Sequence, residues 1–131
     1  MTFKSQHISI SINCPVDEVY EFASNPINIP KWAAGLSSSI EIVNGVVIAE
    51  SPIGKVRVKF SDENPFGILD HDVTLPSGEV IYNPMRVIQN SNGSELIFTL
   101  YKREGMSDKM FSEDVEMIKH DLEKLKALLE K

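Results

Sequence analysis

Residues 5–32 read SQHISISINCPVDEVYEFASNPINIPKW, and this stretch decides the fold. Ile8, Ile10 and Ile12 alternate with serines, which places the three isoleucines on one face of an extended strand. Pro15 suits the first turn of a helix, where its missing N–H costs nothing, and the acidic pair that follows complements the positive helix end. The stretch therefore predicts a strand that passes at once into a helix.

The helix that follows Pro15 is short. Val19 and Ala23 belong to a set of apolar residues at helical spacing, so one face of this helix packs inward. Asn25-Pro26 ends it, because the residue before a proline is driven out of the helical region. A second short segment then closes on Trp32. The first strand is thus followed by two short helices.

From residue 40 to residue 102 the apolar period changes to two, which indicates strands. Asn44-Gly45 between Ile42 and Val46 is a strong two-residue hairpin signal. Clusters of Pro, Gly, Ser and Asn separate the later runs. After the first hairpin, the predicted strands are Gly54–Phe60, Gly67–Leu75, Glu79–Gln89 and Glu95–Lys102.

The last segment predicts a long helix with a continuous apolar stripe, capped by Ser107 or Asp108. Opposite charges three residues apart are expected on its solvated side. The stripe consists of Phe111, Val115, Ile118, Leu122, Leu125 and Leu129, and the charge pairs are Glu116–Lys119, Asp121–Lys124 and Glu123–Lys126.

These elements predict an α+β fold in one domain spanning residues 1–131. A curved antiparallel sheet of about seven strands needs an element to fill its concave face, and only the C-terminal helix is large enough. The two short helices after the first strand can close one end. This is the helix-grip architecture, in which a sheet wrapped on one helix tends to leave an apolar cavity.

Composition narrows the function classes. With 131 residues and a net charge of −6, the chain lacks the clustered Lys and Arg of a nucleic-acid binder, and Lys55, Arg57 and Lys59 instead alternate with apolar residues along one strand face. Cys14 is the only cysteine, which excludes an internal disulfide and disfavours a cysteine-based metal site. No signal peptide and no run of ~20 apolar residues stands out. A soluble, cytoplasmic protein without stable membrane insertion is expected.

The opening stretch also resembles a known family. The pattern Ala/Cys-Pro-x-x-x-Val-Trp/Tyr-x-Phe after the first strand, here Cys14, Pro15, Val19, Tyr20 and Phe22, is similar to the polyketide cyclase/dehydrase and START-related (SRPBCC) lipid-binding superfamily. The resemblance covers the element order of the whole chain and the first 32 residues closely. It implies the helix-grip fold and a place among cyclases, ligand carriers, lipid-transfer modules and chaperone-associated domains. It does not choose between them.

His71 is the residue on which chemistry depends. Alternation places it with Leu69, Val73 and Leu75 on the inner sheet face, where an imidazole can act as a general acid or base or anchor a ligand oxygen. A core histidine satisfied by one partner is the simpler interpretation and is favoured over catalysis. Asp70 and Asp72 are not expected to form a dyad with it, because neighbours on a strand point to opposite faces.

The other candidate residues lie in later strands and at the end of the second helix. Arg86 could hold a carboxylate or phenolate if it faces inward, although a surface ion pair is the better expectation. Pro84 leaves open whether Tyr82 and Arg86 or Asn83 and Met85 face the interior, because a bulge would reverse their facing. The candidate ligand-binding residues are Trp32, Leu69, His71, Tyr82, Met85, Arg86 and Phe98.

Three functions remain possible at this stage. The leading prediction is binding of a small hydrophobic or aromatic molecule in an internal cavity. The second is a cyclase-like enzyme in which His71 moves a proton and Arg86 or Tyr82 steadies an oxyanion. The third is a chaperone-associated interaction domain, which would need an exposed apolar patch on the outer sheet face.

No cofactor or metal ion is expected. The chain contains no dinucleotide-binding, P-loop or nucleophile-elbow motif. Its histidines, His7, His71 and His120, are widely separated, and His120 falls off the apolar stripe of its helix. The oligomeric state does not follow from the sequence.

Overall fold

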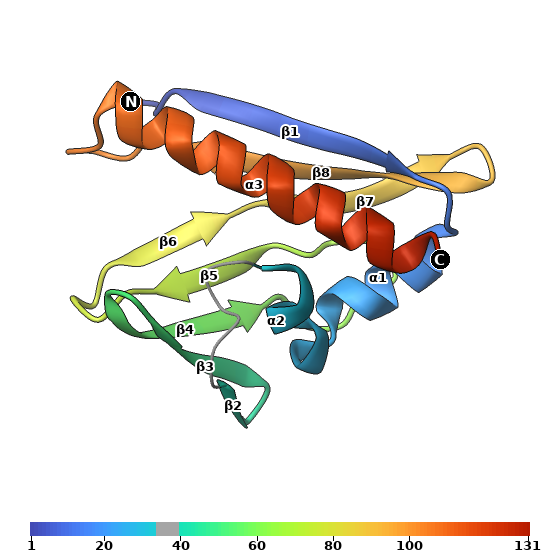
Figure 1. Cartoon of the computed structure of the whole chain (residues 1–131), viewed down its shortest axis with the longest axis horizontal. Coiled ribbons are helices and arrows are strands. Elements are labelled where there is room, and N and C mark those ends of the chain that lie inside the picture. The colour runs from blue at the N-terminus through green and yellow to red at the C-terminus, as the bar shows by residue number, and fades with distance from the viewer. Residues whose placement is uncertain (34–39) are drawn as a thin grey trace.

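The computed structural model describes residues 1–33 and 40–131, and it confirms the helix-grip fold (Figure 1). The opening stretch forms a strand, a helix and two further helical turns, as predicted. These elements are β1 (Ser5–Ile12), α1 (Val16–Ser24), the 3-10 turn η1 (Pro26–Asn28) and α2 (Ile29–Trp32).

The remaining strands form two antiparallel sheets. The five-stranded sheet has the order β2-β3-β4-β5-β6, and the three-stranded sheet has the order β1-β8-β7. The strands after α2 are β2 (Ile40–Val43), β3 (Val46–Ser51), β4 (Gly54–Phe60), β5 (His71–Thr74), β6 (Val80–Asn83), β7 (Met85–Asn90) and β8 (Gly93–Tyr101). The predicted β2–β3 hairpin is confirmed, and both of its turn residues, Asn44 and Gly45, have positive φ.

The predicted strand Glu79–Gln89 is wrong as a single element, because the chain divides at Pro84 into β6 and β7. Proline lacks the N–H that a central strand position must donate. Before β5, the chain pairs with β7 instead: Leu69 N donates to Met85 O at 2.8 Å and Val87 N donates to Gly67 O at 3.0 Å. Gly67 has a φ of +71°, and a Cβ there would lie 2.3 Å from Val87 O, so this close approach requires glycine. The two sheets meet here, and the described residues form eight strands, one more than the approximately seven predicted.

The long helix α3 (Asp108–Leu129) runs along β1 and β8 on the concave side, with α1 and α2 near its C-terminal half (Figure 1). Ser107 caps it, and its hydroxyl accepts a hydrogen bond from Met110 N at 3.1 Å. The predicted pair Glu116–Lys119 is present at 3.4 Å. The described residues contain no helix with the length and apolar character that crossing a membrane requires.

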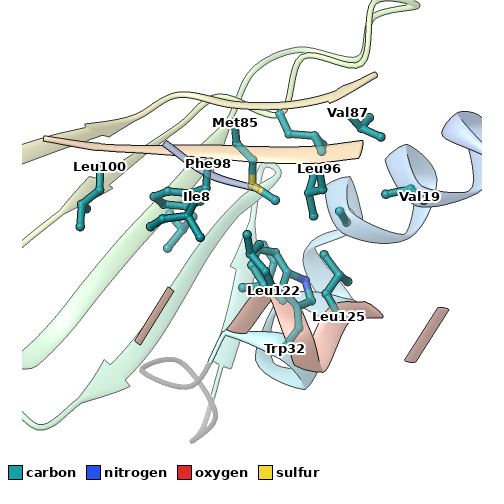
Figure 2. Close-up of a cluster of buried hydrophobic side chains, with 14 of the residues drawn as sticks. Ile8, Val19, Trp32, Met85, Val87, Leu96, Phe98, Leu100, Leu122 and Leu125 are labelled. Carbon is teal, nitrogen blue, oxygen red and sulfur yellow. The ribbon is translucent and has the colours of Figure 1, made fainter. Parts of the chain in front are cut away.

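Figure 2 shows how the core joins these layers. Met85, Leu96 and Phe98 project from β7 and β8 toward Leu122 and Leu125 of α3. The indole of Trp32 lies beside these two leucines, and all six side chains are buried. The apolar stripe of α3 is therefore covered by the sheets and by α2.

The corner between β1 and α1 is fixed by polar contacts. Ser94 Oγ donates to Cys14 O at 2.6 Å, which ties the corner to β8. The Cys14 thiol donates to Glu18 Oε2 at 3.1 Å, and burial together with this carboxylate raises the pKa of Cys14 to about 11. The thiol is thus protonated at neutral pH, as expected of a structural cysteine.

Candidate functional site

A cavity of about 290 Å³ lies between the five-stranded sheet, α2 and α3. Its lining is predominantly apolar, with a few polar side chains. Ile53 and Met117 are exposed at 65 % and 44 %, so the cavity reaches the surface beside them. The lining residues are Ile29, Trp32, Ala33, Ser51, Ile53, Val56, Val58, Phe60, His71, Val73, Leu75, Asn83, Phe98, Met117, Ile118, Asp121 and Leu122.

The sheet contributes a row of three side chains that crosses β4, β5 and β6. In the strand registers, Phe60 lies opposite His71, and His71 lies opposite Asn83. Residues directly opposite each other in antiparallel strands share a face, with Cβ atoms about 5 Å apart. The sheet therefore places an imidazole and an amide next to each other in the cavity wall.

The His71 ring is held in one orientation. It stacks on Phe60 with the ring centroids 4.7 Å apart, and it meets Phe98 edge-on at 5.7 Å. Its Nδ1 lies 3.0 Å from Leu69 O, and a carbonyl can only accept, so Nδ1 carries the hydrogen. Nε2 of the neutral ring is then a hydrogen-bond acceptor with no partner among the described residues.

His71 is also held neutral. Its side chain is buried, and desolvation lowers the pKa of His71 below its ordinary value of 6.5. The hydrogen bond to Leu69 and the charges of Asp70 and Asp72 oppose this shift but do not outweigh it. At neutral pH the ring is a fixed, uncharged acceptor.

Two further polar side chains make no hydrogen bond among the described residues, and of their polar atoms Trp32 Nε1 is the one that is fully buried. Asn83 is 9 % exposed, and its side-chain amide makes no hydrogen bond there. Trp32 is 5 % exposed, and its Nε1 is buried and unpaired. An unsatisfied buried donor or acceptor costs about 1–3 kcal/mol, so such groups in a native structure call for an explanation.

Asp121 corrects an expectation about α3. It was predicted on the solvated side, but it is 6 % exposed and lines the cavity. The reason is its spacing, because Asp121 lies three residues after Ile118 and four before Leu125, which are stripe positions. No Lys or Arg occurs among the described residues that line the cavity.

The opposite face of the same strands carries a different polar cluster, centred on Asp70. Its Oδ1 accepts from Arg86 Nε at 3.0 Å and from Met85 N at 2.8 Å. Its Oδ2 accepts from Arg86 Nη2 at 2.8 Å and from Tyr82 Oη at 3.0 Å. The hydrogen bonds from Arg86 are the main reason why the pKa of Asp70 lies below its ordinary value.

The structure brings together only some of the predicted site residues. Trp32, His71 and Phe98 line the cavity. Leu69 and Met85 are fully buried, but they belong to the core behind it. Tyr82 and Arg86 lie on the outer face at the Asp70 cluster and do not reach the cavity.

Two cavity residues were missed by the sequence reasoning. For Asn83 the sequence allows either facing, and in the structure Asn83, Met85 and Val87 are all buried, so the break at Pro84 does not reverse the alternation. The spacing of Asp121 on the stripe would have identified it. Lys55, Arg57 and Lys59 are exposed on β4, as predicted.

A larger hollow of about 800 Å³ lies between α1, the loop before β5 and the β7–β8 turn. Its walls include exposed polar side chains such as Asp17, Glu63 and Gln89. It holds none of the buried, unpaired polar groups described above. Within the described ranges, no three His, Cys, Asp or Glu side chains are placed to hold a metal ion.

The described geometry defines a helix-grip protein with a cavity under its long helix. No family model and no curated protein matches the sequence. Solved structures do match the fold. DynU16 from the dynemicin biosynthetic locus is 16 % identical with a TM-score of 0.73, and the match covers 97 % of this chain but 47 % of that one.

Two further structures match over nearly their whole length. Aha1 from Colwellia psychrerythraea, solved as a dimer, is 16 % identical with a TM-score of 0.74, covering 97 % of this chain and 96 % of that one. Ara h 8.0201 is 14 % identical with a TM-score of 0.68, covering 96 % and 97 %. At these identities the likeness establishes the fold alone.

Proposed function

We propose that this protein binds a small hydrophobic or aromatic molecule in the cavity under α3. The observation that carries the proposal is the cavity itself, a mostly apolar space in which two buried polar side chains from neighbouring strands, His71 and Asn83, have unused hydrogen-bonding capacity. Ligand sites typically combine apolar walls with a few placed polar groups. The volume of about 290 Å³ is near the lower end of the roughly 300–1,000 Å³ that such sites span.

The resemblance of the opening stretch to the polyketide cyclase/dehydrase and START-related superfamily supports this proposal. The fold neighbours are consistent with it, since they include a protein from a biosynthetic locus. Fold likeness does not identify a ligand, so the proposal rests on the cavity of this chain.

A pair of matched substitutions tests the proposal. Val73 lines the cavity, and Val80 on the partner strand β6 is 56 % exposed. We expect native mass spectrometry with a panel of lipids and aromatic metabolites to detect a complex for the wild type and for Val80→Phe. Val73→Phe fills part of the cavity and should lose the complex. Equal binding by Val73→Phe and Val80→Phe would exclude this cavity as the site.

A second candidate is a cyclase-like enzyme in which His71 accepts a proton from the bound molecule. The unprotonated Nε2 of His71, a residue that lines the cavity, favours it. Asn83 is the available neighbour for a developing oxyanion, because Arg86 and Tyr82 are engaged with Asp70 on the other face. If His71 is catalytic, His71→Gln should abolish turnover of a cyclisable substrate while the complex with it still forms. Unchanged turnover would remove this candidate.

A further inference from the structure

The chemistry of the cavity wall restricts what can bind there. Because Nδ1 of His71 donates to Leu69 O, Nε2 can only accept, and it requires a ligand group that donates. The amide of Asn83 can both donate and accept. A single hydroxyl group between the two side chains would donate to His71 and accept from Asn83.

The same wall does not favour an anion. Neutral His71 offers no N–H from Nε2, and none of the described lining residues is Lys or Arg. Asp121 adds a carboxyl group to the wall. A buried carboxylate or phosphate needs a cation or several donors to offset its desolvation. Among the described lining residues, the donors not already used are the amide of Asn83 and the indole N–H of Trp32, because the Ser51 hydroxyl donates to Gly54 O.

Size gives the third restriction. A protein cavity of about 150 Å³ lined by aliphatic and aromatic side chains holds one benzene ring. The present cavity is about twice as large, at about 290 Å³. Its walls include the aromatic side chains of Trp32, Phe60, His71 and Phe98, which favour contact with an aromatic molecule.

We propose that the ligand is an uncharged, hydroxylated molecule of about two rings, with its hydroxyl hydrogen-bonded to Nε2 of His71 and to the amide of Asn83. This rests on the proposed function, because it specifies the ligand class of the same cavity. It excludes fatty acids and other carboxylates from the site. It also distinguishes His71 and Asn83 as the residues that select the ligand, while the apolar walls supply most of the affinity.

Four probes that share one ring system test the requirement for a hydroxyl group and the exclusion of carboxylates. They are 2-naphthol, 2-methoxynaphthalene, naphthalene and 2-naphthoate. Calorimetric titration at pH 7 should give the tightest binding for 2-naphthol. Loss of one hydrogen bond weakens binding by about threefold to tenfold, so 2-methoxynaphthalene, which can accept but not donate, should bind more weakly by that factor. Naphthalene makes neither hydrogen bond and should bind more weakly by about tenfold to a hundredfold. For 2-naphthoate we expect no measurable binding.

Variants test the assignment of the two residues. His71→Leu should remove the advantage of 2-naphthol over 2-methoxynaphthalene, whereas His71→Gln should retain part of it, because a Gln carbonyl oxygen can replace Nε2 as acceptor. If His71→Leu fails to fold, Asn83→Leu should reduce the advantage of 2-naphthol over naphthalene, because the hydroxyl oxygen then loses the amide from which it accepts. Circular dichroism of each variant checks its fold.

The outcomes separate the two proposals. If naphthalene and 2-naphthol bind equally, or if 2-naphthoate binds as tightly as 2-naphthol, the hydroxyl assignment is wrong but a hydrophobic site remains. If no member of the set binds, both the hydroxylated-ligand class and the proposed function for a molecule of this size are contradicted.

Discussion

The two faces of the β5–β6 hairpin use polar residues in opposite ways. On the outer face, Asp70 satisfies four donors from Arg86, Tyr82 and Met85. On the inner face, His71 and Asn83 are almost fully buried, and each leaves hydrogen-bonding capacity unused. Asp70 and His71 are neighbours in the chain, so the contrast arises from strand alternation alone. A satisfied cluster stabilises the fold, whereas unpaired buried groups lower stability unless a ligand completes them.

The Asp70 cluster is expected to give the largest change in stability. Asp70→Ala leaves Met85 N without its acceptor and Arg86 without its partner, and the free energy of unfolding should fall by about 2–4 kcal/mol. Urea denaturation measures this. Asp72→Ala is the matched control on the same strand, because Asp72 is exposed, and its effect should stay within about 0.5 kcal/mol. An Asp70→Ala protein as stable as the control would mean that the outer cluster does not hold the β6–β7 break.

Acid should lower the stability of the protein in two separate pH ranges, one set by His71 on the inner face and one by Asp70 on the outer face. The pKa of His71 is lowered from 6.5 in the folded protein, so as the pH falls His71 is protonated in the unfolded chain before it is protonated in the folded one. The stability that is present above pH 6.5 is therefore lost as the pH falls from 6.5 toward the folded pKa. The pKa of Asp70 is lowered from 3.8, so its contribution is present above that value and is lost only below it. Unfolding followed from pH 8 to pH 2 should show both losses.

His71→Gln should remove the first of these losses and leave the second. Asp70→Ala should do the reverse. A first loss that persists in His71→Gln would show that another group titrates there.

Removing one hydroxyl from the outer cluster should cost less. Tyr82→Phe deletes the hydrogen bond to Asp70 Oδ2, and Tyr82 is 49 % exposed, so a decrease of about 0.5–1 kcal/mol is expected. The pKa of Asp70 should rise, because one of the hydrogen bonds that lower it is lost. NMR titration of the Asp70 carboxyl carbon measures that rise, and an unchanged pKa would contradict the role of Tyr82.

The smallest expected effect has the opposite sign. Asn83→Leu replaces a buried side-chain amide that makes no hydrogen bond among the described residues with an apolar side chain of similar size, so the unliganded protein should gain up to about 1 kcal/mol. Urea denaturation of Asn83→Leu and Tyr82→Phe, each compared with the wild type, measures the two changes in the free energy of unfolding. A loss as large as that of Tyr82→Phe would show that Asn83 is satisfied in the free protein.

The sequence predicts the fold of this protein better than it predicts the candidate site. The β1–α1 stretch and the stripe of α3 have strong periodicity, and both elements were predicted correctly. Alternation also placed His71 inside. It could not fix the facing around Pro84, because whether a proline shifts the register depends on the partner strands. In the structure, Asp70 accepts Met85 N across this break, so a long-range contact holds the register.

The cavity depends on such long-range contacts throughout. Asn83 and His71 are 12 residues apart in the sequence but directly paired across β5 and β6. Asp121 lines the same cavity from α3, although the charge pairs of the helix predict it on the solvated side. No local pattern states that an amide will lack a partner, because that is a property of the packed sheet and helix together.

The central claim is that the inner polar groups are left unpaired for a ligand. Thermal unfolding of the wild type and of Asn83→Leu, each with and without 2-naphthol, tests it most directly, because a ligand raises the melting temperature only by binding the folded state. The account predicts that Asn83→Leu is at least as stable as the wild type without 2-naphthol, and that the increase on adding it is smaller than in the wild type. An Asn83→Leu protein that is less stable but shows the full increase would contradict it.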